Sequence, residues 1–184
     1  MKKNFPVLKR KSIFSGRAIK LEKLLLRAPD GRVFDRELIR HIGAAVAVPV
    51  LPGERFVLVN QHRVAADDWL LEFPAGTLEV GEKPRTCAYR ELIEEAGYRA
   101  GKLTKLVDFY PAPGISTERM YLYLATNLKP APVHLDGDEF LNVKVLSYRE
   151  LEKKVKHGRI KDGKTIVGFF YYQELRSKFR RLIG

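Results

Sequence analysis

The sequence predicts an α/β or α+β fold in which helices cover both faces of a sheet. Its 184 residues suit one domain with a short appended subdomain. A hydrophobic content of 45% with 30% charged residues is an ordinary balance for a protein with a buried core. Apolar segments of strand length are interspersed with three segments that carry helical signals. Together these observations indicate a layered sandwich.

The N-terminal segment, residues 1–41, predicts an antiparallel hairpin. Residues 13–27 are rich in leucine and β-branched side chains, and residues 33–40 continue this pattern. The Ala-Pro-Asp-Gly sequence at residues 28–31 between them favours a tight turn. Because two short strands make a poor core on their own, we expect this segment to pack on the main domain or on a second subunit.

The remaining residues, 42–184, contain the other predicted strands. A second hairpin is expected where a Leu-Pro-Gly-Glu turn joins two apolar segments, residues 44–50 and 55–61. A Gly- and Pro-bearing segment at residues 72–81 leads into the first helix. Further strands are expected at residues 103–110, 119–126 and 140–146.

Three helices are predicted in this part of the chain. The first begins near Pro84, since proline suits the first helical position, where its missing N–H costs nothing. The second covers residues 148–157, because Ser147 with Glu150 three residues later forms a capping box. The last helix is expected at residues 165–180.

The composition limits the classes of function. The net charge of +12 is concentrated near the chain ends and attracts anions in general; a solvated surface also explains it, so charge alone names no partner. Cys87 is the only cysteine, which rules out an internal disulfide and makes a reducing cytoplasm the expected location. Structural zinc, a membrane span and a secretory signal are not expected.

The first predicted helix, residues 84–97, gathers its carboxylates on one side. Ala88, Leu92 and Ala96 fall together on one face, and the opposite face carries Glu91, Glu94 and Glu95. Glu91 and Glu95 are i and i+4 neighbours, and their like charges destabilise a helix unless a cation lies between them. Three glutamates alone are also typical of a solvated acidic face. If they face inwards, they suit Mg²⁺, which prefers carboxylate oxygens and retained water.

Residues that flank these glutamates favour the metal site over the solvated face. Gly76, Glu82 and the sequence Arg-Glu-Leu-Ile-Glu-Glu-Ala-Gly at residues 90–97 stand at fixed spacings within 23 positions. This pattern resembles the Nudix box of the Nudix hydrolases at every fixed position. The final aliphatic position is Tyr98 here, a departure that affects packing rather than chemistry. The match is a specific signal.

The resemblance extends to the subfamily of ADP-ribose and ADP-sugar pyrophosphatases. The Glu-Phe-Pro-Ala-Gly sequence at residues 72–76 is similar to the lead-in of that group. Pro-Gly-Ile-Ser-Thr-Glu at residues 113–118 resembles its Pro-Gly-x-Ser/Thr-x-Glu segment, and Pro113 lies 16 residues after Gly97, near its marker proline. Residues 61–63 and 40–46 are similar to two further segments, although Ile42 replaces a proline. The resemblance covers about residues 13–175.

The resemblance implies a Nudix-type α/β/α sandwich with a mixed sheet and N-terminal antiparallel strands. It also implies a homodimer in which residues 1–41 reach the partner while residues 42–184 form the hydrolase domain. It assigns magnesium binding to the carbonyl of Ala75 and the carboxylates of Glu91, Glu94 and Glu95. It assigns structural roles in the box to Gly76, Glu82, Arg90 and Gly97.

Other roles follow from the same resemblance. A carboxylate from residues 135–140 is expected to complete the metal cluster or to act as the base, with Glu139 the best match and Asp138 and Asp136 as alternatives. Glu94 is a further catalytic candidate. Substrate contacts are expected from Arg40, Arg63, Glu72, Ser116 and Glu118, with Arg63 suited to bind phosphates bidentately. The choice of the residue that stacks on adenine stays open between Tyr110, Phe34 and Trp69.

The resemblance therefore implies Mg²⁺-dependent hydrolysis of ADP-ribose to AMP and ribose 5-phosphate, with Mn²⁺ as a substitute metal. Another nucleoside diphosphate sugar, such as GDP-mannose or ADP-glucose, is the alternative substrate. A basic nucleotide- or RNA-binding module on a Nudix scaffold and an RNA 5′-end pyrophosphohydrolase are two further hypotheses. A membrane is not an expected partner, and nucleic acid is disfavoured.

Overall fold

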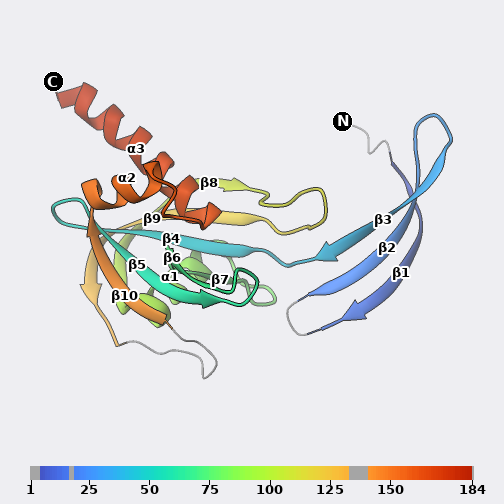
Figure 1. The fold of residues 1–184 in the computed structure, drawn as a ribbon, viewed down its shortest axis with the longest axis horizontal. Helices are drawn as coiled ribbons and strands as arrows, with labels where there is room; N and C mark the ends of the chain where they lie inside the picture. Colours follow the sequence, from blue (N-terminus) through green and yellow to red (C-terminus); the bar gives the residue numbers. More distant parts are fainter. Residues whose placement is uncertain (1–4, 17–18, 133–140, 184) are drawn as a thin grey trace. The chain divides into compact units, whose positions relative to one another are not determined.

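The computed structural model describes residues 5–16, 19–132 and 141–183 (Figure 1). The chain forms two compact units, one made of Met1–Gly43 with Tyr110–Arg119 and the other of Ala44–Phe109 with Met120–Gly184. None of the helices in the described ranges is long and apolar enough to cross a membrane.

The N-terminal unit contains a three-stranded antiparallel sheet in the order β1-β2-β3. Its strands are β1 (Val7–Ser15), β2 (Lys20–Arg27) and β3 (Val33–Arg40). The predicted hairpin is confirmed as the β2–β3 pair, whose turn is closed by the Ala28 N–H donating to the Arg32 carbonyl at 2.8 Å. The prediction was wrong in extending the first strand from residue 13 to 27. That stretch belongs to two strands, since β1 ends at Ser15 and β2 begins at Lys20.

This unit buries little apolar surface of its own. Among its described residues, only Leu24 is a fully buried apolar side chain, whereas Ile13 and Phe14 are about half exposed. Residues 110–119 add to it through two backbone hydrogen bonds: the Ile39 N–H donates to the Ile115 carbonyl at 2.8 Å, and the Thr117 N–H donates to the Ile39 carbonyl at 2.9 Å. A segment remote in sequence thereby pairs with the end of β3.

The second unit is built on a mixed sheet with the strand order β10-β5-β4-β9-β8. Its central strand β4 (Ala44–Leu51) pairs in parallel with β9 (Met120–Pro130), while the other pairs are antiparallel. Two short strands, β6 on β5 and β7 on β4, were not predicted. Strand β7 lies inside the Gly- and Pro-bearing segment at residues 72–81, which has the composition of a loop. The remaining bounds are β5 (Arg55–Arg63), β6 (Asp68–Glu72), β7 (Ala75–Thr77), β8 (Tyr98–Phe109) and β10 (Leu141–Ser147).

Three helices cover the two faces of this sheet. They are α1 (Pro84–Ala96), α2 (Tyr148–Lys156) and α3 (Gly163–Ile183). Gly97 closes α1 in the left-handed conformation, with φ of 70°, and its N–H donates to the Ile93 carbonyl at 3.0 Å. The capping box predicted for α2 is present between Ser147 and Glu150.

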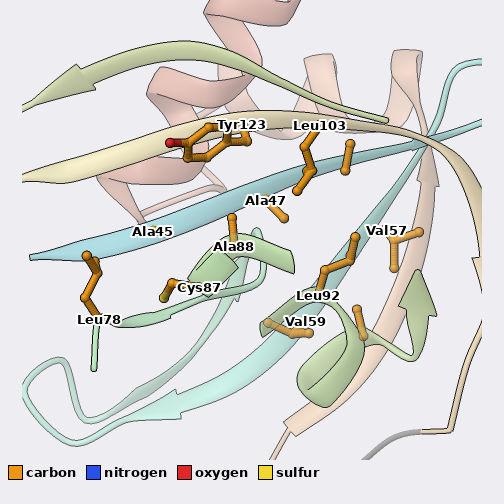
Figure 2. Packing of buried hydrophobic residues seen from close by; sticks show 12 residues of the cluster. Ala45, Ala47, Val57, Val59, Leu78, Cys87, Ala88, Leu92, Leu103 and Tyr123 are labelled. Carbon is orange, nitrogen blue, oxygen red and sulfur yellow. The ribbon is translucent and has the colours of Figure 1, made fainter. Parts of the chain in front are cut away.

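Alternation along the strands sends successive side chains to two separate cores. Ala45 and Ala47 of β4 pack with Cys87, Ala88 and Leu92 of α1 (Figure 2). The other face has a second core, to which α2 and α3 contribute: Val46, Val48, Phe56, Leu58, Phe73, Leu122, Tyr148, Leu151, Ile160 and Phe169. The predicted α/β/α sandwich is confirmed.

Candidate active site

Two buried carboxylates on α1 face strand β7. Glu91 and Glu95 are only 7% and 2% exposed. The Ala75 N–H donates to Glu95 Oε2 at 2.9 Å, and a Cβ added to Gly76 would lie 1.8 Å from Glu91 Oε1. Only glycine fits at this position because the carboxylate takes the space of a side chain. Two of the three glutamates of the acidic face are therefore turned into the protein, which excludes a fully solvated face.

The thiol of Cys87 contacts the backbone of β7 at Gly76. Its Sγ donates to the Gly76 carbonyl at 3.4 Å, and the residue is fully buried. Burial raises the pKa of this thiol to about 12, and the nearby charges of Glu91 and Glu82 add to the rise. The neutral thiol is consequently a hydrogen-bond donor and not a nucleophile.

Arg90 joins the loop before α1 to the carboxylates on the helix. Its guanidinium contacts Glu82 Oε1 at 3.2 Å, Glu91 Oε1 at 2.7 Å and Glu94 Oε2 at 2.9 Å. The hydrogen bonds from Arg90 hold the pKa of Glu82 below its usual range, and Glu82 also accepts from the Glu79 N–H at 3.0 Å. Arg90 and Glu82 thus join the segment before α1 to the helix.

Glu72, at the end of β6, is a fully buried carboxylate held by two cations. Arg63 donates to it through Nε at 2.8 Å and through Nη2 at 2.6 Å, and the Lys164 ammonium also donates to Oε2. Burial raises the pKa of Glu72, but its bonds to Arg63 and Lys164 outweigh burial and lower the pKa overall. Arg63 has a raised pKa, caused mainly by its hydrogen bonds to Glu72, with the charge of Glu95 contributing. Its guanidinium thus lies within electrostatic reach of the carboxylates on α1.

The start of α3 fixes the residue after Glu72. Asp162 accepts from the Thr165 N–H at 2.9 Å and from the Thr165 hydroxyl at 2.6 Å, as a helix cap does. Thr165 Oγ1 in turn accepts the Phe73 N–H at 2.7 Å, and Lys164 donates to Asp162 at 3.0 Å. Sequence reasoning missed Asp162, Lys164 and Thr165. The signal that could have found them is an Asp three residues before a Thr at the start of a helix.

The substrate candidates fall into two groups. Arg63 and Glu72 belong to the second unit, where they pair with each other. Arg40, Ser116 and Glu118 belong to the N-terminal unit. Within that unit Arg40 donates to Glu22 at 2.8 Å, and Ser116 Oγ accepts the Glu118 N–H at 3.0 Å.

Local bonds arrange the end of β3 and the segment that pairs with it. Thr117 Oγ1 accepts from the His41 N–H at 2.9 Å and donates to the His41 carbonyl at 3.1 Å. His41 Nδ1 also lies 4.0 Å from Glu118 Oε1.

Of the base candidates, Glu139, Asp138 and Asp136 lie outside the described residues. The aromatic candidates Tyr110 and Trp69 are about half exposed.

The buried carboxylates have the donor chemistry of a hard divalent cation. No group of three or more His, Cys, Asp or Glu side chains is gathered as a ligand cluster within the described part of the chain. Mg²⁺ sites, however, often use one or two carboxylates together with water and substrate phosphates. Glu91, Glu95 and the Ala75 carbonyl meet that requirement, while Glu94 is one-third exposed and engaged by Arg90. The residues present therefore fit such a cation.

Comparison with known proteins agrees with this geometry. The NUDIX domain model matches residues 41–166. The chain belongs to the Nudix family, as the box predicted, and is a Nudix hydrolase; these enzymes generally use divalent metal ions.

Two relatives match most of the chain. The sequence is 38% identical over 168 residues to a methanol dehydrogenase activator of Bacillus methanolicus. This match covers 90% of this chain and 91% of the relative. It is 36% identical over 166 residues to an ADP-ribose pyrophosphatase of Bacillus subtilis (strain 168), covering 89% and 90%. A crystal structure of an ADP compounds hydrolase superposes with a TM-score of 0.85 over 96% of both chains at 22% identity, which supports the fold.

The close approach at Gly76 gives a test of the site. We expect Gly76→Ala to displace the Glu91 carboxylate, because the new methyl group and Oε1 cannot both occupy their positions. The affinity for Mg²⁺ or Mn²⁺ in calorimetric titration should fall at least about tenfold. Gly163→Ala is the matched control, since nothing lies within 4 Å of a Cβ there. Equal metal affinity in the two variants would contradict the assignment.

Proposed function

We propose that this Nudix hydrolase cleaves the diphosphate bond of ADP-ribose in a magnesium-dependent reaction, giving AMP and ribose 5-phosphate. The observation that carries the proposal is the pair of buried carboxylates, Glu91 and Glu95, packed against β7 at a glycine. The Pro113 segment and the similarity to an ADP-ribose pyrophosphatase favour this substrate over other nucleoside diphosphate sugars. A cytoplasmic location suits a chain whose single cysteine is buried.

A bound divalent cation would neutralise the diphosphate and make an attacking water more acidic. Glu91, Glu95 and the carbonyl of Ala75 are the groups that would hold it, with Glu94 at the edge. Mg²⁺ is the proposed metal because all of these donors are oxygens, and Mn²⁺ is expected to substitute. The hydrogen bond from the Ala75 N–H to Glu95 holds the Glu95 carboxylate and the backbone at Ala75 in place relative to each other.

Arg63 is the proposed partner of the substrate phosphates. Its Nε and Nη2 are fixed on Glu72, so the guanidinium is oriented before substrate binds. A guanidinium held in place loses less conformational entropy on binding than a free one. Glu72, with both oxygens engaged, would act by orienting Arg63.

The reaction forms one P–O bond to water and breaks one bridging P–O bond. The water loses a proton to a base, and the departing phosphate carries the electron pair of the broken bond. Glu139 is the proposed base, with Asp138 and Asp136 as alternatives. Arg40, Ser116 and Glu118 are proposed to contact the substrate.

The function is tested by the products and by the metal requirement. We expect the purified protein to convert ADP-ribose to AMP only when Mg²⁺ or Mn²⁺ is present, and faster than GDP-mannose or ADP-glucose. Glu95→Gln should lower kcat by about 100-fold, because the amide keeps the contact with Ala75 but not the charge.

The control for charge removal is Glu79→Gln. Glu79 is exposed and lies between β7 and α1. A protein that binds nucleotides but releases no AMP with either metal would be a binding module and would refute the proposal. Preferential release of GMP from GDP-mannose would move the substrate to the other sugar nucleotide.

Glu139→Gln tests the assignment of the base. Turnover should fall by roughly two or more orders of magnitude with an unchanged melting temperature, since the amide cannot take the proton from water. Asp136→Asn and Asp138→Asn should retain most of the turnover. Near-normal rates in Glu139→Gln would remove this residue from the mechanism.

We also propose that the N-terminal strands form a homodimer interface. Ile13 and Phe14 of β1 are 50% and 55% exposed, which is unusual for large apolar side chains in a sheet with so little core. Light scattering should give twice the 21.1 kDa chain mass. The double variant Ile13→Glu with Phe14→Glu should shift the protein towards monomer, whereas Val80→Glu, at a 97% exposed apolar residue, should not. A monomeric wild-type protein at micromolar concentration would disprove the dimer.

A further inference from the structure

One face of the second unit has a concentration of positive charge that the hydrolase site does not use. Residues 153–161, here called the basic segment, read Lys-Lys-Val-Lys-His-Gly-Arg-Ile-Lys and contain no acidic residue. The segment covers the end of α2 and the connection to α3. Five formal positive charges therefore lie within nine residues.

The helix dipole explains part of this charge but not all of it. Lys153, Lys154 and Lys156 occupy the last turn of α2, where cations are favourable. Gly158, with φ of 64°, ends the helix, so Arg159 and Lys161 lie beyond the reach of that effect. Both are exposed.

The basic segment is poorly neutralised by its surroundings. Lys156 pairs with Glu152 at 2.9 Å. The charge of Lys154 acts on Glu150, one helical turn before it. Within the described part of the chain, the side chains of Arg159 and Lys161 form no ion pair. A cation without a protein counter-ion is available to an external anion.

The segment also lines two adjoining hollows. One, of about 450 Å³, lies between the basic segment and β6, and its lining includes Asp68, Trp69, Lys154, His157, Arg159 and Lys161. The other, of about 360 Å³, is lined by Glu150, Lys153, Lys154, His157 and Arg159. Because Lys154, His157 and Arg159 line both hollows, the two adjoin at these side chains.

An aromatic side chain stands at the edge of this surface. Trp69 is 46% exposed, and its ring meets His62 edge-on, with 5.7 Å between ring centroids. Its neighbour Asp68 is held by the Trp69 N–H at 2.7 Å and contributes one of the two carboxylates in the hollows. An exposed indole beside the unpaired cations Arg159 and Lys161 is the combination that binds unpaired bases together with their phosphates.

We propose that this surface binds single-stranded nucleic acid, with backbone phosphates on Lys154, Arg159 and Lys161 and one base stacked on Trp69. A duplex would satisfy the charges but leave the indole without a base, because paired bases are stacked on each other. An acidic peptide would lack the planar group. The binding needs none of Glu91, Glu95 or a metal, so it is independent of the proposed hydrolysis.

Trp69 is the only tryptophan of the chain and reports on this surface directly. Titration of the protein in EDTA with a twelve-nucleotide oligouridylate or oligothymidylate should quench its fluorescence, and the two oligonucleotides distinguish RNA from DNA. The affinity should fall steeply with NaCl. Glu95→Gln should bind as the wild-type protein does, which separates this result from any failure of the hydrolase proposal.

Variants identify the residues. The triple variant Lys154→Ala, Arg159→Ala and Lys161→Ala should reduce the slope of log affinity against log salt by about 2, at about 0.7 per lost phosphate contact. The matched control removes three exposed cations from β8 and β9 of the same unit: Arg99→Ala, Lys102→Ala and Lys129→Ala. It should keep the wild-type slope.

Substitution of the aromatic residue completes the test. By fluorescence anisotropy of labelled oligonucleotide, Trp69→Ala should bind about tenfold more weakly, and Trp69→Phe should recover most of the loss. The proposal is overturned if the two triple variants lose affinity equally. It is also overturned if duplex DNA, polyglutamate or ADP-ribose alone binds this surface as tightly as the single strand.

Discussion

The architecture around the active site depends on one close approach, that of the Glu91 carboxylate to the backbone at Gly76. A side chain at residue 76 would occupy the position of that carboxylate. Since β7 pairs with β4, and α1 packs its apolar face on β4, the separation between helix and strand is set by the core. Two acidic groups are thereby held inside the protein, where charge is costly unless it is bound. The same packing that stabilises the fold holds together the two carboxylates that we propose as ligands of a cation.

The second constraint is the compensation of buried charge around Glu72. Two cations, Arg63 and Lys164, surround this carboxylate, and Asp162 balances the second cation, so the formal charges of the four groups cancel. Breaking such a group by removing one partner leaves an uncompensated buried charge, which is far more costly than the net value of the pair. The group joins β5, β6 and the start of α3, and its carboxylate, Glu72, lies just before β7 in the sequence. Helix α3 consequently acts as a support for the site although it carries none of the expected metal ligands.

The parts of this structure that the sequence predicts are those encoded locally. The helix with Glu91 and Glu95, the capping box at Ser147 and the β2–β3 turn each depend on residues within one or two turns of each other. Strand β7 escaped prediction because its three residues include Gly76 and follow a proline, which is loop composition, and its pairing with β4 is a tertiary effect. The bonds of Glu72 to Lys164 and of Phe73 to Thr165 each span 92 positions, so no local pattern announces them.

The difference between local and distant contacts also explains why the sequence identifies the family more readily than it identifies the substrate. The chemistry resides in a box of 23 consecutive positions, whose spacing is fixed by one helix and the loop before it. The candidate substrate contacts Ser116 and Glu118 reach β3 only because residues 110–119 pair with Ile39 across more than seventy positions. Their local bonds, such as that of Thr117 with His41, fix the segment without specifying which sugar nucleotide it meets. If Ser116 and Glu118 contact the substrate as proposed, changes within residues 110–119 would alter substrate choice and leave the carboxylates on α1 as they are.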